Sequence, residues 1–134
     1  MAKCGTKKLT LFSIAFALLA NFFSNADEDV WRIYFEEANG DVYFYDMSRV
    51  KKTFDLHTVW SRIRYKRTVM AAASYQSLVE VDCAQRTERT LQRTFFSDKH
   101  WEDPAMKTDT KPKRKRPIKE GSAAERLSAI LCDP

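Results

Sequence analysis

The sequence predicts an α+β fold: an antiparallel β-sheet of about five to six strands, with one C-terminal helix packed on one face and tethered by a disulfide. Three observations support this prediction. Residues 30–97 contain successive runs of strand-forming residues separated by turns, and residues 122–131 carry apolar side chains at helical spacing. One cysteine, Cys83, lies within the first region, and another, Cys132, directly follows the second. A series of strands followed by a helix is typical of the α+β class.

The first 26 residues are predicted to be a secretory signal peptide. Three lysines and no acid precede an apolar run over residues 9–23, and a Ser-Asn-Ala step ending at Ala26 provides the cleavage site. The run is shorter than the roughly 20 residues that cross a bilayer, which favours cleavage over an uncleaved membrane anchor. We therefore expect a single domain over residues 27–134, without a transmembrane segment after cleavage.

A β-hairpin is predicted at the start of the mature domain. Residues 30–35 are rich in the aromatic and β-branched types that favour strands. Asn39-Gly40-Asp41 follows, and asparagine and glycine tolerate the positive φ that tight turns require. Residues 41–46 then supply the returning strand, which completes the hairpin.

A central strand is predicted over residues 74–83, because its side chains alternate in character. Tyr75, Val79 and Val81 fall on one face, and polar residues such as Glu80 fall on the other. A period of two over this length indicates a strand with one buried face and one wet face.

Two more strands are expected on either side of the central strand in the sequence. Residues 56–65 alternate between two faces, and residues 87–97 carry apolar side chains among threonines and arginines after a short turn at residues 84–86. Two neighbouring segments have alternative interpretations. Residues 48–52 fit a turn of helix or a connecting strand, and residues 68–73 could continue the strand before them or bend away.

Residues 99–119 are predicted to form a long, solvated, basic loop. Three prolines interrupt the segment, and its apolar side chains follow no period. Residues 107–119 hold seven Lys and Arg against one acid, a net charge of +6. Such a cluster attracts anionic partners such as a sulfated glycan or an acidic protein, and a solvated loop without a partner is the alternative. The cations available to an anionic partner are Lys111, Lys113, Arg114, Lys115, Arg116 and Lys119.

The closing helix is predicted over residues 122–131. Ser122 and Glu125 form a capping box, in which the Ser122 hydroxyl accepts a backbone N–H while Glu125 reaches back. The apolar side chains on one side of this helix are Ala123, Leu127, Ile130 and Leu131. Ten residues would not stay helical alone in water, so we expect this side to pack against the sheet.

Cys83 and Cys132 are predicted to form a disulfide. They are the two cysteines left after signal cleavage, and an even number in an exported chain favours a disulfide over a metal site or a reactive thiol. Two unpaired buried thiols are the alternative. Closing the long interval between them would stabilise the domain by roughly 4 kcal/mol in the chain-entropy model.

The sequence carries no catalytic or cofactor-binding motif. Neither of its histidines, His57 and His100, has a second histidine or a cysteine three or four positions away. A Gly-x-Ser-x-Gly nucleophile turn and a glycine-rich phosphate loop are both missing. We therefore expect no enzymatic activity, no metal and no cofactor. The basic segment also lacks aromatic side chains on which bases could stack, so sequence-specific binding of nucleic acid is not expected.

A series of aromatic residues, short motifs and cysteines extends over nearly all of the mature chain. In order, these are Trp31, Tyr43-Phe44-Tyr45-Asp46, Val59-Trp60, Ser74-Tyr75, Val81-Asp82-Cys83, Arg86, Arg89, Pro117-Ile118, Gly121-Ser122 and Cys132. This order resembles the surface-adhesin protein E family of exported bacterial proteins. The resemblance implies an antiparallel sheet with a disulfide-tethered C-terminal helix and binding of host extracellular-matrix proteins. Arg116 and Glu120 stand where the family commonly has an aromatic residue and a proline, and no binding residue is carried over.

The expected function is that of an exported, non-catalytic binding protein in the periplasm or at the cell surface. Its loops would contact a host matrix protein or an anionic glycan. The alternative is a periplasmic interaction or structural module that acts on another envelope protein. An enzyme is compatible with the sequence only if His57 or His100 lies in a cleft with carboxylates. Aromatic side chains on both faces of the strands indicate that the second face is covered, and a homodimer would provide such a cover.

Overall fold

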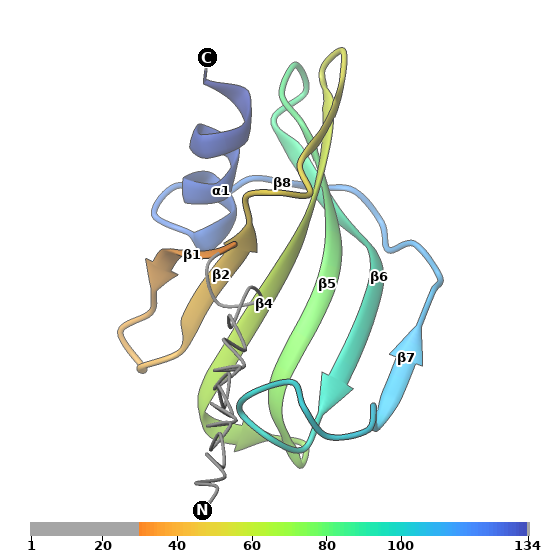
Figure 1. Ribbon diagram of the computed structural model, residues 1–134. Helices are drawn as coiled ribbons and strands as arrows, with labels where there is room; N and C mark the ends of the chain where they lie inside the picture. The colour runs from red at the N-terminus through yellow and green to blue at the C-terminus, as the bar shows by residue number, and fades with distance from the viewer. Residues whose placement is uncertain (1–29, 134) are drawn as a thin grey trace, which may run out of the picture.

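The computed structural model describes residues 30–133, so the predicted signal peptide lies outside the described residues. This part of the chain forms one antiparallel sheet of eight strands and one helix (Figure 1). The elements are β1 (Trp31–Glu36), β2 (Val42–Asp46), β3 (Lys51–Thr53), β4 (Leu56–Val69), β5 (Ala72–Asp82), β6 (Thr87–Phe96), β7 (Lys107–Asp109), β8 (Arg116–Pro117) and α1 (Ala123–Cys132). The sheet order is β1-β2-β4-β5-β6-β7, with β3 paired to β4 and β8 paired to β6.

The α+β class, the antiparallel sheet and the C-terminal helix are confirmed, but the eight strands exceed the five to six predicted. Three short strands account for the difference. β3 overlaps the end of the ambiguous segment at residues 48–52, and β7 and β8 lie within the predicted loop at residues 99–119. Strands of two or three residues are too short to show an alternation of side chains in the sequence.

Residues 107–119, called the basic segment below, lie along β6 instead of extending freely into solvent. The backbone N–H of Lys113 donates to the carbonyl of Thr90 at 2.8 Å, and that of Ile118 donates to the carbonyl of Arg86 at 3.0 Å. In Figure 1 this segment runs from β7 past β8 to α1. The backbone of the basic cluster therefore has a defined position on the sheet.

The hairpin of β1 and β2 is confirmed, and its turn uses the predicted residues. Gly40 has a φ of +94°, a conformation that side chains with a Cβ adopt rarely. The backbone N–H of Asp41 donates to the Asn39 side chain at 2.8 Å. The Asp41 carboxylate in turn accepts the backbone N–H of Lys66 at 2.8 Å, which ties the hairpin to β4.

The turn between β4 and β5 resolves the ambiguity at residues 68–73. Val69 pairs with Ala72, and the two residues between them, Met70 and Ala71, have φ values of 49° and 67°. Two consecutive residues with positive φ form the type of turn that joins twisted strands most tightly. The sequence gives little sign of it because this turn usually carries asparagine and glycine.

The prediction of one buried and one wet face for the central strand is only half right. Val79 and Val81 are buried as expected, but Glu80 on the opposite face is also buried, with 9% of its surface exposed. Arg89 of β6 covers it and donates to its carboxylate at 2.7 Å. The pairing of β5 with β6 shifts between Leu78 and Val79, which leaves an extra residue on β6.

The core lies between α1 and one face of the sheet. Leu127 and Leu131 of α1 pack with Val59, Val79 and Val81 of β4 and β5. Partly buried side chains extend this cluster, and they are Tyr34, Tyr45, Val50, Cys83, Ile118 and Cys132. The predicted disulfide is present between Cys83 and Cys132, whose Cα atoms are 5.6 Å apart. It joins the residue after β5 to the last residue of α1.

The capping box of α1 forms as predicted, except that Glu125 accepts the backbone N–H of Gly121 instead of that of Ser122. The Ser122 hydroxyl accepts the backbone N–H of Glu125 at 3.2 Å, and the Glu125 carboxylate accepts the backbone N–H of Gly121 at 2.7 Å. The apolar face is narrower than predicted, because Ile130 is 40% exposed. Over residues 30–133, the structure contains no helix that is long and apolar enough to span a bilayer.

Candidate functional site

Three of the six predicted anion-binding cations are paired with carboxylates of the sheet. The Lys113 amine lies 2.8 Å from Asp109 of β7. The Arg116 guanidinium lies 3.0 Å from Glu88 of β6, and the Lys115 amine lies 3.6 Å from Asp82 of β5. These ion pairs neutralise half of the cluster.

The other three cations, Lys111, Arg114 and Lys119, are exposed. Within residues 30–133, their side chains have no ion-pair partner. An exposed cation without a partner can contact an anion without first giving up a carboxylate. The structure therefore divides the predicted set into a paired half and an unpaired half, and anion binding itself stays a prediction.

Asp109 organises the start of the basic segment. Its carboxylate accepts hydrogen bonds from the Lys113 amine at 2.8 Å, from the backbone N–H of Lys111 at 2.9 Å and from Arg93 at 3.3 Å. The hydrogen bond from Lys113, followed by that from the Lys111 backbone, holds the pKa of Asp109 well below its usual range. A carboxyl group with a lowered pKa stays charged at neutral pH, so these three contacts persist there.

A cavity of about 400 Å³ lies at the start of α1, next to the basic segment. Its lining residues are Phe35, Glu37, Tyr43, Glu88, Arg116, Pro117, Lys119, Gly121, Ser122, Ala123 and Ala124. Both signs of charge are present in this lining. The Tyr43 hydroxyl donates to Glu37 at 2.8 Å, and burial together with this bond raises the pKa of Tyr43 well above its usual value. The lining contains no histidine and no cysteine.

The two histidines lie in different surroundings. His57 is buried between two backbone carbonyls, with its Nδ1 2.7 Å from the oxygen of Leu131 and its Nε2 3.0 Å from the oxygen of Phe54. His100 lies in an exposed loop, where its backbone N–H donates to Asp98 at 2.9 Å. Neither residue lines the cavity at the start of α1, and the expectation of no enzymatic activity stays a prediction.

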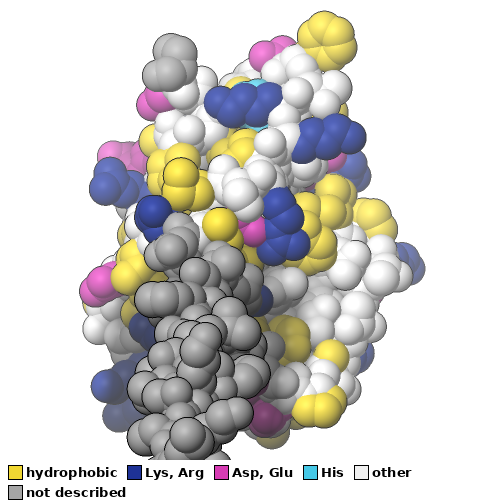
Figure 2. Space-filling model, viewed as in Figure 1, with side chains coloured by type: hydrophobic (Ala, Val, Ile, Leu, Met, Phe, Trp, Pro, Cys, Tyr) yellow, Lys and Arg dark blue, Asp and Glu magenta, His cyan; other side chains and the backbone are white. Residues whose placement is uncertain are grey.

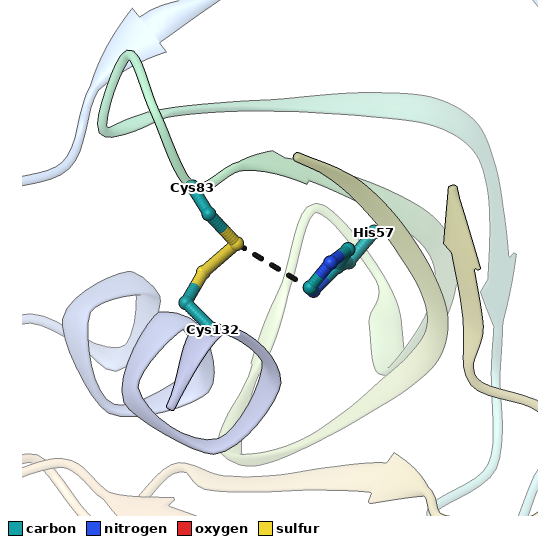
Figure 3. A group of neighbouring side chains, drawn as sticks. All are labelled: His57, Cys83 and Cys132. Atoms are coloured by element: carbon teal, nitrogen blue, oxygen red, sulfur yellow. Dashed lines mark hydrogen bonds between the residues drawn. A yellow bond between two sulfur atoms is a disulfide. The ribbon is translucent and has the colours of Figure 1, made fainter. Parts of the chain in front are cut away.

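His57 lies next to the disulfide, as Figure 3 shows. The sulfur of Cys83 is 3.5 Å from His57 Nδ1, and the possible ligand atoms of His57, Cys83 and Cys132 all lie within 4.8 Å of one another. Sequence reasoning missed this group, because the three residues come from β4, from the end of β5 and from the end of α1. Only the pairing of the two cysteines could have indicated it.

The sheet face opposite α1 carries arginine side chains stacked on aromatic rings. Trp60 and Arg62 alternate with the core residues of β4, so they lie on this other face. The Arg62 guanidinium is 4.1 Å from the ring centre of Trp31 and 4.7 Å from that of Trp101. Figure 2 shows basic and hydrophobic side chains side by side on the visible face. These contacts cover aromatic rings within one chain, and the homodimer stays a prediction.

Asp46 fixes another arginine on this face. Its carboxylate accepts hydrogen bonds from the backbone and the hydroxyl of Ser48, and from the guanidinium of Arg49. Burial raises the pKa of Asp46, but the hydrogen bonds outweigh burial and lower this pKa below its usual value. Arg49 is thereby held between the rings of Trp31 and Trp60, 5.8 Å and 5.7 Å from their centres.

Comparison with known proteins identifies related chains. The family described as surface-adhesin protein E matches residues 31–133. Crystal form II of Haemophilus influenzae protein E aligns with a TM-score of 0.62 and 10% identity, over 77% of this chain and 87% of that one.

Two further solved structures are similar. The selenomethionine form of Haemophilus influenzae protein E aligns with a TM-score of 0.60 and 11% identity, over 77% of this chain and 85% of that one. Protein E from non-typeable Haemophilus influenzae aligns with a TM-score of 0.59 and 10% identity, over 77% of this chain and 75% of that one. At this identity the structures show a shared fold alone. No curated protein matches the chain.

Proposed function

The chain belongs to the surface-adhesin protein E family, and we propose that it is an exported, non-catalytic adhesin that holds an anionic partner with Lys111, Arg114 and Lys119. The partner would be a host matrix protein or an anionic glycan. The division of the basic segment into paired and unpaired cations supports this proposal most directly.

The unpaired cations are suited to this task because their backbone is already ordered. The segment is hydrogen-bonded along β6, and Asp109 holds its start through Lys113 and the Lys111 backbone. Less conformational entropy is therefore lost when a partner binds than if the segment were free. Attraction from exposed charges acts over a Debye length of about 8 Å at physiological salt, so binding should weaken steeply as salt is raised.

Two triple variants with the same change in charge test the proposal. In one, the unpaired cations Lys111, Arg114 and Lys119 are replaced with serine. In the other, the paired cations Lys113, Lys115 and Arg116 are replaced with serine. We expect the first variant to lose retention on immobilised heparin at physiological salt while its Tm is unchanged. The second should keep most of its retention but melt at a lower temperature, because each lost surface ion pair costs up to about 1 kcal/mol.

Equal losses of retention in the two variants would contradict a role for the unpaired cations and would indicate that net charge alone attracts the resin. Retention that survives high salt in the wild type would contradict an electrostatic contact altogether. That second outcome would favour the face on which Arg62 stacks with Trp31 and Trp101 as the binding surface.

A further inference from the structure

We propose that His57, Cys83 and Cys132 form a binding site for a thiophilic divalent cation, of which Zn²⁺ is the natural example, once the disulfide is reduced. The disulfide and the metal would then be alternative links between the end of β5 and the end of α1. This inference is independent of the anion-binding proposal, because it concerns the opposite end of α1.

The three side chains already converge on one point (Figure 3). Their candidate ligand atoms lie within 4.8 Å of one another, and Cys83 Sγ is 3.5 Å from His57 Nδ1. Ligand atoms around one tetrahedral zinc, with Zn–S near 2.3 Å and Zn–N near 2.1 Å, lie within about 4 Å of each other. Opening the disulfide lets the two sulfurs separate to such a spacing, and small side-chain rotations supply the rest.

His57 can serve as a metal ligand through Nδ1 while Nε2 keeps its backbone partner. Its Nε2 lies 3.0 Å from the carbonyl oxygen of Phe54, and a neutral imidazole donates through one nitrogen only. In the oxidised protein Nδ1 lies 2.7 Å from the carbonyl oxygen of Leu131, which can only accept a hydrogen bond. A metal at Nδ1 would replace this hydrogen bond, while the ring proton on Nε2 stays bonded to Phe54. Ligating histidines usually donate their second N–H to a carbonyl or a carboxylate in this way.

The local electrostatics also favour a cation. Nδ1 is 2.7 Å from the carbonyl oxygen of Leu131, which belongs to the last turn of α1. The carbonyls that end a helix carry partial negative charge and stabilise cations. A metal at this position would therefore face two thiolates, one imidazole and the negative end of the helix.

A second cavity offers an entry path for the ion. It has a volume of about 200 Å³ and is lined by Cys83 and Cys132 together with the carboxylates Asp82 and Asp133. His57 lies deeper and is 8% exposed. The cavity thus lies beside both cysteines, and its lining carries three acidic residues, Asp82, Glu125 and Asp133, against one cation, Arg86.

The change from the disulfide to the metal site balances chemically when a dithiol is the reductant. The disulfide takes two electrons and two protons from the dithiol, which becomes a disulfide itself, and two thiols remain on the protein. Binding of the divalent ion then displaces these two protons and gives two thiolate ligands. Two sulfurs and one nitrogen leave a fourth tetrahedral position for water. The oxidised protein has no thiolate to offer and should not bind.

The test is a titration of the whole mature protein with Co²⁺, after reduction with dithiothreitol and desalting without oxygen. We expect one Co²⁺ per chain, with a thiolate-to-cobalt absorption band that Zn²⁺ abolishes, and no such band in the oxidised protein. His57→Ala should weaken metal binding at least about tenfold, the lower end of what removal of even an outer-shell partner costs. His100→Ala, the matched histidine control, should change nothing.

Two results would overturn the proposal. One is the absence of a cobalt–thiolate band at one ion per chain in the reduced wild type. The other is an unchanged affinity in a folded His57 variant, because two thiols alone would then account for the signal. If His57→Ala fails to fold in its oxidised form, His57→Gln provides a second variant, since its amide can still bond a backbone carbonyl but is a poor zinc ligand.

Discussion

Replacement of Cys132 with serine is expected to lower the free energy of unfolding by roughly 4 kcal/mol. The disulfide closes an interval of 49 residues, and the chain-entropy model gives this value for a loop of about that length. A small domain has a total stability of only about 5–15 kcal/mol, so the loss is large. The loss of stability should be concentrated in α1. This helix is joined to the sheet by the packing of Leu127 and Leu131, by the contact of His57 with the Leu131 carbonyl and by this one covalent bond.

Urea unfolding gives the change in free energy, and amide hydrogen exchange shows where it falls. Exchange should accelerate over residues 123–132, while β1 and β2 stay protected by their hairpin pairing. Cys83→Ser is the matched control and should give the same loss, and the double variant should add little to either single variant. A change of less than about 1 kcal/mol would show that the tether contributes little to this domain.

Replacement of Leu127 with alanine is expected to destabilise the protein by about 2–5 kcal/mol, the range for leucine-to-alanine changes in well-packed cores. Leu127 is 1% exposed and packs with Val59, Val79 and Val81. Truncation leaves a cavity between α1 and the sheet that the disulfide prevents from closing freely. Ile130 lies on the same helix but is 40% exposed, so Ile130→Ala should cost much less.

The two helix variants are compared by denaturant unfolding of the oxidised proteins, so that the disulfide is intact in both. A similar loss in both variants would mean that burial of the Leu127 side of α1 does not hold the helix on the sheet. Ser122 and Glu125, which form the capping box, are unchanged in both variants, and circular dichroism checks that the helix content is retained.

Features that depend on neighbouring residues in the chain could be predicted from the sequence. The turn at Gly40 and the capping box of Ser122 and Glu125 are local, and both form. The disulfide was also predictable, because only Cys83 and Cys132 remain after the signal segment. These features determine the fold class, since they fix the first hairpin, the last helix and the link between them.

Features that depend on tertiary pairing could not be predicted. Arg89 covers Glu80 from the next strand, which makes a polar strand face buried. The pairing of Lys113, Lys115 and Arg116 with carboxylates on three different strands depends on how the basic segment lies along the sheet. His57 meets the disulfide only because β4 and the end of α1 are adjacent in space. The periodicity of side chains within a short stretch of sequence does not indicate such contacts.

The proposal of a surface adhesin is tested most directly by labelling intact bacteria with a lysine reagent that does not cross membranes. Mass spectrometry then measures the modification of each lysine in the recovered protein. We expect Lys111 and Lys119 to be labelled on intact cells, and the paired Lys113 to react more slowly because its amine is bonded to Asp109. Labelling that occurs only after the outer membrane is permeabilised would contradict a surface adhesin and would support a periplasmic interaction module.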